Sequence, residues 1–424
     1  MSASDEPRTS ERPPVEIVAV PGGGDGVALL AGLLPAALAG ERVVALVPAY
    51  AEAGVRATIR QAVTPVQGSM LPPGAAIICP TSGSTGRPRG VVLTAEQIRG
   101  AARVRDEAQG GPSAWLLGVP PVTAPALAAL ARARTAEAPV ASWRGAGVGG
   151  FDPASFIADA RALLAAAEGA GLRARTSLVA AQLRLLLLSG DGAADTLARF
   201  DSVLVGGGPT SPSLAAQAAA AGVRLVRTYG MTETFGGCVY DGLGLPGVSI
   251  RIDRPDPDGV GQVLLGGPML AGGYTDGPLR LIHGLLATGD RGRLVPAAAD
   301  GATDAPLRLE LSGRGDDVVT VGGANVDVAA VAQAVGEHPG IADCAVVPVA
   351  AQDGGHRLVA FVVPVPAASD GAMLNADDLA ADLRSAVGDV LGRAARPEVR
   401  VVPALPLLPG GKVDHQRLVE EESR

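Results

Sequence analysis

Strand-like and helix-like segments alternate from residue 15 to about residue 311 of this chain. Short apolar runs rich in β-branched residues predict buried strands at residues 76–78, 115–119, 202–205 and 223–228. Longer Ala- and Leu-rich stretches predict helices at residues 95–109, 153–168, 179–188 and 211–221. Such alternation is typical of an α/β fold, and we predict a layered α/β domain at residues 15–312. Within it, short strands between Gly, Pro and Asp clusters predict a β-rich subdomain at residues 244–311.

A smaller unit follows the polar turn Gly313-Arg314-Gly315-Asp316-Asp317, which interrupts two strand-like runs. Strand, helix, strand, strand, helix and strand then follow at residues 318–321, 326–335, 342–349, 357–363, 376–391 and 399–402. About 110 residues of mixed α+β structure suffice for a separate domain, residues 313–424. Asp316 is the predicted hinge. The polar, Pro-containing residues 1–14 predict a disordered tail.

Charge and cysteine usage exclude several classes of protein. A net charge of −8 gives no attraction to nucleic acid or to an anionic membrane. The longest apolar runs are shorter than the roughly 20 residues that span a bilayer, so no membrane span is predicted. Cys79, Cys238 and Cys344 lie far apart, which fits a reducing cytoplasm and favours neither a disulfide framework nor a metal cluster. The sequence leaves the oligomeric state open, a homodimer included.

Among the 35 lysine and arginine residues there is one lysine, Lys412. Because nearly every other cationic position has become arginine, an ammonium group at this position indicates a chemical requirement there. The alternative is chance, since a single lysine has to fall somewhere.

A polar loop separates two apolar runs at residues 75–79 and 91–93. Its small residues leave backbone N–H groups and hydroxyls free to wrap a polyphosphate, and its arginines supply charge. The residues assigned to this phosphate loop are Thr81, Ser82, Gly83, Ser84, Thr85, Gly86 and Arg89. The loop does not match the lysine-containing P-loop pattern and no helix is predicted directly after it, which disfavours an ordinary P-loop kinase or ATPase.

Five further motifs follow the phosphate loop along the chain. They are Gly206-Gly207-Gly208-Pro209, Thr228-Tyr229-Gly230-Met231-Thr232-Glu233-Thr234, Thr288-Gly289-Asp290, Gly313-Arg314-Gly315-Asp316-Asp317 and Gly410-Gly411-Lys412-Val413-Asp414. In this order the motifs resemble the acyl-adenylate-forming superfamily of acyl-CoA synthetases, adenylation domains and luciferases, from about residue 75 to residue 418. The resemblance implies a large N-terminal domain and a small mobile C-terminal domain. It implies an AMP-forming acid-thiol ligase that uses ATP, Mg²⁺, a small carboxylic acid and coenzyme A.

The glycine motif and the tyrosine after it are suited to a nucleobase. A turn through Gly207, Gly208 and Pro209 lets the backbone approach a flat ring closely. Tyr229 offers a ring face on which adenine can stack, with Thr228 and Gly230 on either side of it in the chain. Together these residues predict the nucleobase slot.

Polar side chains in the later motifs are suited to phosphates and ribose. Thr232 can donate to the α-phosphate, and Glu233 supplies a hard oxygen ligand for Mg²⁺ on the ATP phosphates. Asp290 can accept both ribose hydroxyls, while Arg314 can bind ribose or phosphate from the domain junction.

The resemblance also gives Lys412 a role. In the family the matching lysine reaches from the small domain to the attacked carboxylate and the α-phosphate, where a compact ammonium matches the developing charge. Lys412, Thr232 and Glu233 are therefore the predicted catalytic residues. Asp316 matches the hinge about which the small domain rotates between adenylation and thiolation.

Longer matching stretches, such as residues 113–121 and 227–242, resemble the short actinobacterial o-succinylbenzoate-CoA ligases of menaquinone biosynthesis. The predicted acyl-pocket residues are Thr123, Ser177, Gly206 and Thr234. Three positions depart from the family pattern: Val122-Thr123 replaces an aromatic-His pair, Asn325 a basic residue near the coenzyme A site, and Arg89 the lysine of the phosphate loop. These departures leave two alternatives open, another acid with an amine acceptor or a nucleotide-binding homologue that has lost catalysis. The identity of the acid also stays open.

Overall fold

The computed structural model describes residues 13–67, 69–81, 88–147, 150–190, 192–297, 306–315, 317–351, 354–365 and 376–423. Residues 1–12 of the tail predicted at residues 1–14 therefore lie outside the described residues. The same holds for Ser82, Gly83, Ser84, Thr85 and Gly86 of the phosphate loop and for the hinge residue Asp316.

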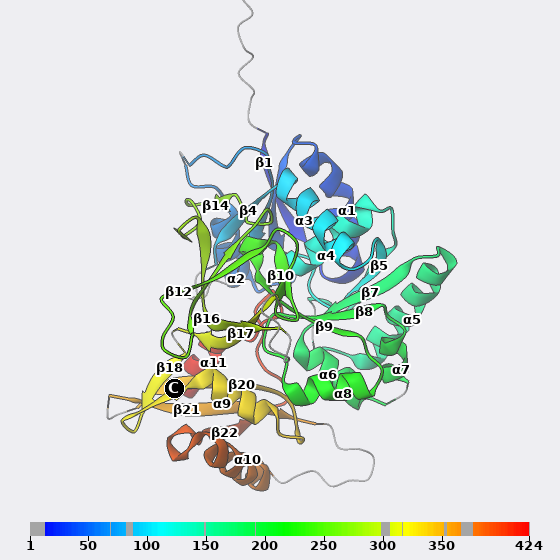
Figure 1. The fold of residues 1–424 in the computed structure, drawn as a ribbon. Helices are drawn as coiled ribbons and strands as arrows, with labels where there is room; N and C mark the ends of the chain where they lie inside the picture. The colour runs from blue at the N-terminus through cyan, green and yellow to red at the C-terminus, as the bar shows by residue number, and fades with distance from the viewer. Residues whose placement is uncertain are drawn as a thin grey trace, which may run out of the picture.

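The large domain begins with a five-stranded sheet in the order β1-β2-β3-β4-β14 (Figure 1). Its strands are β1 (Val15–Val20), β2 (Val43–Pro48), β3 (Ala75–Pro80), β4 (Gly90–Thr94) and β14 (Gly273–Tyr274). The first three strands are parallel, whereas β4 is antiparallel to both β3 and β14. The associated helices are α1 (Gly23–Leu38), α2 (Ala53–Val63) and α3 (Ala95–Ala108). The phosphate loop thus connects two neighbouring antiparallel strands, β3 and β4.

A second sheet of seven strands has the order β11-β10-β9-β8-β7-β5-β6. Its strands are β5 (Ser113–Leu117), β6 (Val140–Ser142), β7 (Arg173–Leu178), β8 (Ser202–Val205), β9 (Leu225–Met231), β10 (Gly236–Tyr240) and β11 (Leu243–Gly244). The helices around it are α4 (Ala124–Thr135), α5 (Pro153–Gly169), α6 (Ala180–Leu188), α7 (Ala193–Ala198) and α8 (Pro212–Ala220). Pairing from β6 through β9 is parallel, as the strand and helix alternation predicts.

Strand β5 is buried on both faces, so it lies at the centre of the large domain. Trp115 and Leu117 belong to the core shared with α1, α3 and α4. Ala114 and Leu116, which point the opposite way, belong to a second core with α5 to α8.

The β-rich subdomain is a third sheet, in the order β12-β13-β16-β15, with β17 paired to β16. Its strands are β12 (Ser249–Asp253), β13 (Gly261–Gly266), β15 (Leu281–Ile282), β16 (Leu285–Pro296) and β17 (Leu307–Arg314). Strand β17 pairs Arg314 with Asp290 of β16, so the junction between the domains lies beside a predicted ribose ligand.

The small domain packs below the large one in Figure 1, with α10 at the far end of the molecule. Its strands are β18 (Val318–Val321), β19 (Ala324–Asp327), β20 (Ile341–Ala350), β21 (His356–Pro364) and β22 (Glu398–Val401). Its helices are α9 (Val328–Gly336), α10 (Ala376–Leu391) and α11 (His415–Glu422). Two apolar cores belong to this domain alone.

Helix caps agree with the sequence at three places and correct it at one. Thr94, Asp152 and Ser211 each accept backbone N–H groups as N-caps. The helix predicted from residue 326 begins at Val328 instead, because Asp327 Oδ1 accepts the N–H groups of Ala329 and Ala330 and ends β19 there.

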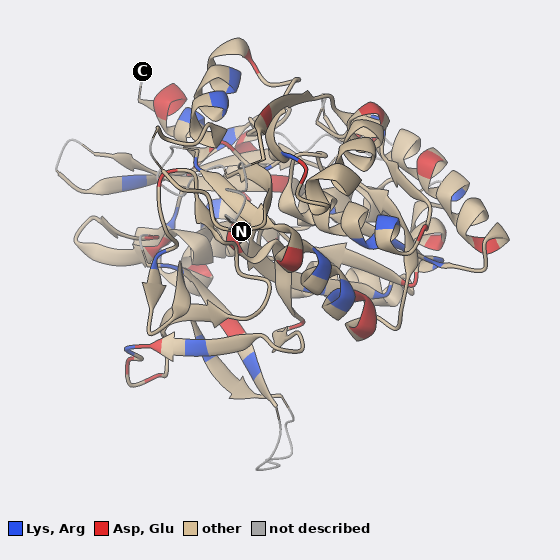
Figure 2. Ribbon diagram, turned by 90° about the horizontal axis from the view of Figure 1, so that it is seen from above, with Lys and Arg blue, Asp and Glu red and all other residues tan. Residues whose placement is uncertain are grey.

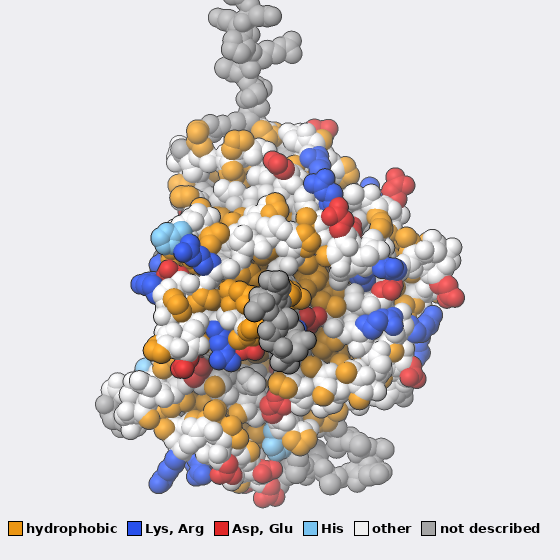
Figure 3. Space-filling view, in the orientation of Figure 1, with side chains coloured by type: hydrophobic (Ala, Val, Ile, Leu, Met, Phe, Trp, Pro, Cys, Tyr) orange, Lys and Arg blue, Asp and Glu red, His pale blue; other side chains and the backbone are white. Residues whose placement is uncertain are grey.

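Acidic and basic residues are interspersed along the ribbon in Figure 2, and the face drawn in Figure 3 also carries side chains of both signs. Within the described ranges, every helix is too short or too polar to cross a lipid bilayer.

Candidate active site

The candidate site lies at the carboxyl ends of the parallel strands β5, β7, β8 and β9. Strand β5 lies between β6 and β7, and both follow it in the chain. The connection after β5 leads to β6 on one side, whereas the connection after β7 leads to β8 on the other. Ligands of open α/β sheets bind in the crevice at such a switch point. The loops there are tied together, since the Gly118 N–H donates to the Ser177 carbonyl at 3.0 Å.

The glycine motif after β8 is held close to β9. A Cβ atom on Gly206 would lie 2.4 Å from Oγ1 of Thr228, so this position accepts glycine alone. Gly207 has φ of +84°, a conformation that glycine adopts without strain. The Thr228 hydroxyl donates to the Val205 carbonyl at 3.3 Å, which fixes Thr228 against β8. The predicted nucleobase slot therefore has its backbone turn and Thr228 side by side.

Tyr229, Asp290 and Arg314 form one hydrogen-bonded group. The Tyr229 hydroxyl donates to Asp290 Oδ2 at 2.7 Å, and Arg314 Nη1 lies 3.5 Å from Asp290 Oδ1. Burial, and then the Asp290 carboxylate, raise the pKa of Tyr229, so its hydroxyl stays a donor at neutral pH. The structure therefore brings the predicted adenine platform, ribose acceptor and junction arginine together.

Glu233 lies in a short 3₁₀ turn, Thr232–Thr234, between β9 and β10. The next residue, Phe235, has φ of +52° and is fully buried, which is an uncommon conformation for an aromatic residue. A buried arginine of α3 holds this turn: Arg105 Nη2 donates to the carbonyl oxygens of Thr234 at 3.2 Å and Phe235 at 2.9 Å.

The Glu233 carboxylate is held by a tyrosine that also touches the phosphate loop. Tyr274 donates its hydroxyl to Glu233 Oε1 at 2.9 Å, and the Arg89 guanidinium lies 3.4 Å from the Tyr274 ring centroid. Arg89 also forms an ion pair with Asp276 at 2.7 Å. At the base of the loop, the Thr81 N–H donates to the Arg89 carbonyl and the Thr81 hydroxyl accepts the Arg89 N–H. Tyr274 thus links Arg89 of the predicted phosphate loop to the predicted metal ligand Glu233.

The donor set fits a magnesium ion bound through nucleotide phosphates. Glu233 offers a hard carboxylate oxygen, and no cluster of three or more metal-binding side chains exists among the described residues. A single carboxylate that completes a shell of phosphate oxygens and waters is the usual way proteins hold Mg²⁺ on a nucleotide.

The four predicted acyl-pocket residues have different surroundings. Thr123 is the N-cap of α4, and its hydroxyl also donates to the Pro120 carbonyl at 2.8 Å. Ser177 is partly buried at the end of β7, beside the Gly118 loop. Thr234 is fully buried, and its hydroxyl bonds the backbone of the turn that carries Glu233. Gly206 lies at the base of the nucleobase turn.

Lys412 lies in a tight turn that reaches the large domain. The Leu408 N–H donates to the Lys412 carbonyl at 2.7 Å, and the Gly411 N–H donates to the Leu408 carbonyl at 2.8 Å. A Cβ atom on Gly411 would lie 3.4 Å from Pro120, and one on Gly410 would lie 3.9 Å from Thr123. The Lys412 side chain is exposed at this junction.

The start of α4 therefore lies between the two predicted catalytic segments. On one side the Gly410-Gly411-Lys412 turn covers Pro120 and Thr123. On the other side Gly236, just after the Glu233 turn, approaches Pro125 to 3.5 Å as measured from its virtual Cβ.

Three site residues were missed in the sequence: Arg105, Tyr274 and Tyr50. Arg105 carried a signal, because it follows Ile98, Ala101 and Ala102 at helical spacing on the apolar face of α3. Tyr274 and Tyr50 carried none, since they reach the site through contacts between segments far apart in the chain.

Comparison with known proteins agrees with this geometry. Residues 31–275 match the family described as AMP-binding enzyme, and residues 330–412 match the AMP-binding enzyme C-terminal domain. The chain belongs to the AMP-binding enzyme family. This confirms the predicted membership of the adenylate-forming superfamily and the enzyme class, an AMP-forming ligase of the acyl-CoA synthetase type.

Individual proteins and solved structures are also similar to this chain. A probable 2-succinylbenzoate–CoA ligase of Mycobacterium tuberculosis is 38% identical over 357 residues, which cover 83% of this chain and 86% of that protein. The fold matches o-succinylbenzoate CoA synthetase from Bacillus subtilis in complex with its acyl-adenylate intermediate. That match has a TM-score of 0.72 and 19% identity, and it covers 97% of this chain and 88% of the other. The amide bond synthetase McbA from Marinactinospora thermotolerans matches with a TM-score of 0.66 at 23% identity, covering 97% of this chain and 90% of the other. The predicted fold class, a large α/β domain with a small C-terminal domain, is confirmed.

Proposed function

We propose that this enzyme adenylates o-succinylbenzoate or a related aryl acid with ATP and transfers the acyl group to coenzyme A in the cytoplasm. The observation that carries the proposal is the contact of the Gly410-Gly411-Lys412 turn with Pro120 and Thr123 at the switch point. The same turn carries Lys412, the one lysine of the sequence, which supports its assignment to catalysis. The relative from Mycobacterium tuberculosis supports the choice of acid and acceptor.

The first half-reaction joins the acid to the nucleotide. A carboxylate oxygen of the acid attacks the α-phosphorus of ATP, the bond to the β-phosphate oxygen breaks, and pyrophosphate leaves. The Lys412 ammonium stabilises the negative charge that develops between carboxylate and phosphate, and Thr232 donates to the α-phosphate. Glu233, held by Tyr274, would hold Mg²⁺, which when bound neutralises phosphate charge. Asp290 and Arg314 orient the ribose, and Tyr229 the adenine.

In the second half-reaction a thiol replaces AMP. The thiolate sulfur of coenzyme A attacks the acyl carbonyl carbon, the bond to the AMP phosphate oxygen breaks, and the thiol proton passes to solvent. The acyl-AMP that the first half-reaction forms is the substrate of the second half-reaction. Lys412 has no role in this second step, because no carboxylate attacks the phosphate and the charge that Lys412 stabilises no longer develops.

The test measures the two half-reactions separately. Acid-dependent exchange of labelled pyrophosphate into ATP reports adenylation, and thioester formation from supplied acyl-AMP reports thiolation. We expect exchange with o-succinylbenzoate and thioester formation with coenzyme A in preference to amines. We expect Lys412→Ala to lower exchange by about 100-fold or more, the scale for one preorganised charge partner. Thiolation should stay within about twofold of the wild type, a change below 0.5 kcal/mol. No exchange across a panel of aryl acids would refute the proposal, and transfer to amines alone would replace its second half.

A further inference from the structure

A side chain from a distant part of the chain bonds the turn that carries Lys412 to the large domain. The Tyr50 hydroxyl, just after β2, donates to the Pro409 carbonyl at 3.0 Å. Pro409 precedes Lys412 by three residues. We propose that Tyr50 is a positioning residue that holds the Lys412 turn in the pose required for adenylation. The inference rests on the proposed function of Lys412 and adds a residue to it.

Packing fixes the position of the Tyr50 ring. It packs against the main core of the large domain, and Gly147 passes so close that a Cβ there would lie 2.8 Å from Cζ of the ring. Gly147 has φ of +90°, so glycine is favoured at this position for two reasons. Burial, and then the neighbouring Cys79, raise the pKa of Tyr50, which keeps the hydroxyl protonated and able to donate.

The turn itself is stiff, so one bond can orient all of it. Besides the two bonds around Lys412, the Asp414 N–H donates to the Pro406 carbonyl at 2.8 Å, and Leu407 and Val413 pair as an antiparallel bridge. The Pro409 carbonyl points out of this closed turn toward Tyr50. Fixing that carbonyl therefore fixes the direction in which the Lys412 backbone faces the start of α4.

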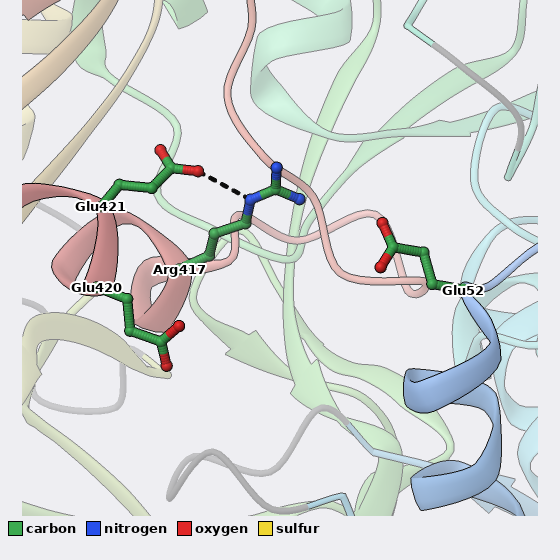
Figure 4. A pocket seen from close by; sticks show the side chains of 4 residues that line it. All are labelled: Glu52, Arg417, Glu420 and Glu421. Carbon is green, nitrogen blue, oxygen red and sulfur yellow. Dashed lines mark hydrogen bonds and ion pairs between the residues drawn. The ribbon is translucent and has the colours of Figure 1, made fainter. Parts of the chain in front are cut away.

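A second junction contact is weaker and serves as a comparison. Glu52, two residues after Tyr50, lines a pocket with Arg417, Glu420 and Glu421 of α11 (Figure 4). Arg417 pairs with Glu421 at 2.9 Å within α11, and Glu52 acts on it only through space. Because Arg417 is exposed, solvent screens this attraction and the pair contributes little. Tyr50 is thus the stronger link next to Lys412.

Tyr50→Phe removes the hydrogen bond to Pro409 but keeps the packing of the ring. Loss of one neutral hydrogen bond corresponds to a factor of about three to ten. We expect the rate of acyl-AMP formation to fall by about that factor. Thiolation of supplied acyl-AMP should stay within about twofold of the wild type, because the lost hydrogen bond stabilises only the pose used for adenylation. Glu52→Gln, the matched control at the same junction, should change adenylation by less than about twofold.

Two further measurements separate positioning from a general structural effect. In the Lys412→Ala background, Tyr50→Phe should cause no further loss of adenylation, because the bond acts through the lysine. Independently of activity, hydrogen exchange in peptides that span residues 406–414 should be faster in Tyr50→Phe than in the wild type and unchanged in Glu52→Gln.

The outcomes are distinct. If Lys412→Ala leaves adenylation intact, the proposed function fails. If Lys412→Ala is impaired while Tyr50→Phe keeps wild-type adenylation, or if the losses of the two variants multiply, the positioning role alone is overturned. Equal losses of adenylation and thiolation in Tyr50→Phe would also overturn it.

Discussion

Tyr274 offers a sharp test of how the metal ligand is held. The Tyr274 hydroxyl donates to Glu233 Oε1 at 2.9 Å, and this hydrogen bond links Tyr274 to the carboxylate. Burial, and then the Glu233 carboxylate, raise the pKa of Tyr274, so the proton that makes this bond is present throughout the neutral range. Tyr274→Phe removes the bond and leaves the ring that supports Arg89.

The expected loss follows from the type of bond. A hydrogen bond to a charged acceptor contributes about 1.5–3 kcal/mol, against about 1 kcal/mol for a neutral pair. Part of that energy fixes the Glu233 rotamer before metal and nucleotide arrive. Residues that orient a metal ligand in this way are worth a factor of about 10 to 100 in metal affinity. We therefore expect the Mg²⁺ concentration for half-maximal adenylation to rise by about tenfold, with the rate at saturating Mg²⁺ largely recovered.

The assay is pyrophosphate exchange over a titration of Mg²⁺ at fixed ATP. Tyr50→Phe is a control, because it removes a tyrosine hydroxyl that bonds Pro409 and not Glu233. Thermal melting checks that both variants fold. An unchanged or tighter Mg²⁺ requirement in Tyr274→Phe would refute the reasoning, since Tyr274 would then compete with the metal for Glu233 instead of orienting it.

Three other variants test separate parts of the structure. Glu233→Gln keeps the shape and loses the charge, so metal-dependent adenylation should weaken while the melting temperature holds; wild-type rates at limiting Mg²⁺ would remove Glu233 from the metal site. Burial raises the pKa of Asp343 from 3.8 to about 6, so the folded state binds more protons and the free energy of unfolding falls as pH rises from 4 to 6. Asp343→Asn should abolish that slope and stabilise the protein at pH 7 by about 1–3 kcal/mol in urea unfolding. Arg105→Met leaves three carbonyl groups of residues 234–237 without their buried donor and should destabilise the fold by about 3–5 kcal/mol. An unchanged stability would show that the turn does not depend on Arg105.

The sequence predicted most of the architecture because its strands and helices carry clear periodicity. Strands β8 and β18 and helix α10 have the predicted bounds. The central strand β7 was not predicted, because Arg173 and Arg175 interrupt its apolar pattern. Arg175 is nevertheless buried, and its guanidinium donates to the carbonyl oxygens of Gln109 and Gly111 in the neighbouring turn. A buried arginine whose Nη groups donate to backbone carbonyl oxygens cannot be recognised as buried from the sequence pattern alone.

Motif order located the site, but it could not show how the site is held. Tyr229, Asp290 and Arg314 were each predicted as nucleotide ligands, and the structure adds that they bond one another. Tyr274 and Tyr50 act across the sheets and across the domain junction, at positions that sequence distance does not reveal. The roles of Ser82, Gly83, Ser84, Thr85, Gly86 and Asp316 remain predictions, because those residues lie outside the described part of the chain.

The junction between the domains is polar, and this bears on how the enzyme can use two poses. The small domain completes its own apolar cores, which include no residue of the large domain. The described hydrogen bonds across the junction run from Tyr50 to Pro409 at one end and from Arg184 to the carbonyl oxygens of Gly336 and Ile341 at the other. Each bond can be exchanged for one with water at a net cost of about 1 kcal/mol. Leaving this pose therefore exposes little apolar surface, and a ligand that contacts Lys412 could shift the balance with a few kcal/mol of differential binding. A junction sealed by buried leucines would cost far more to open, so the polar junction supports a rotating small domain.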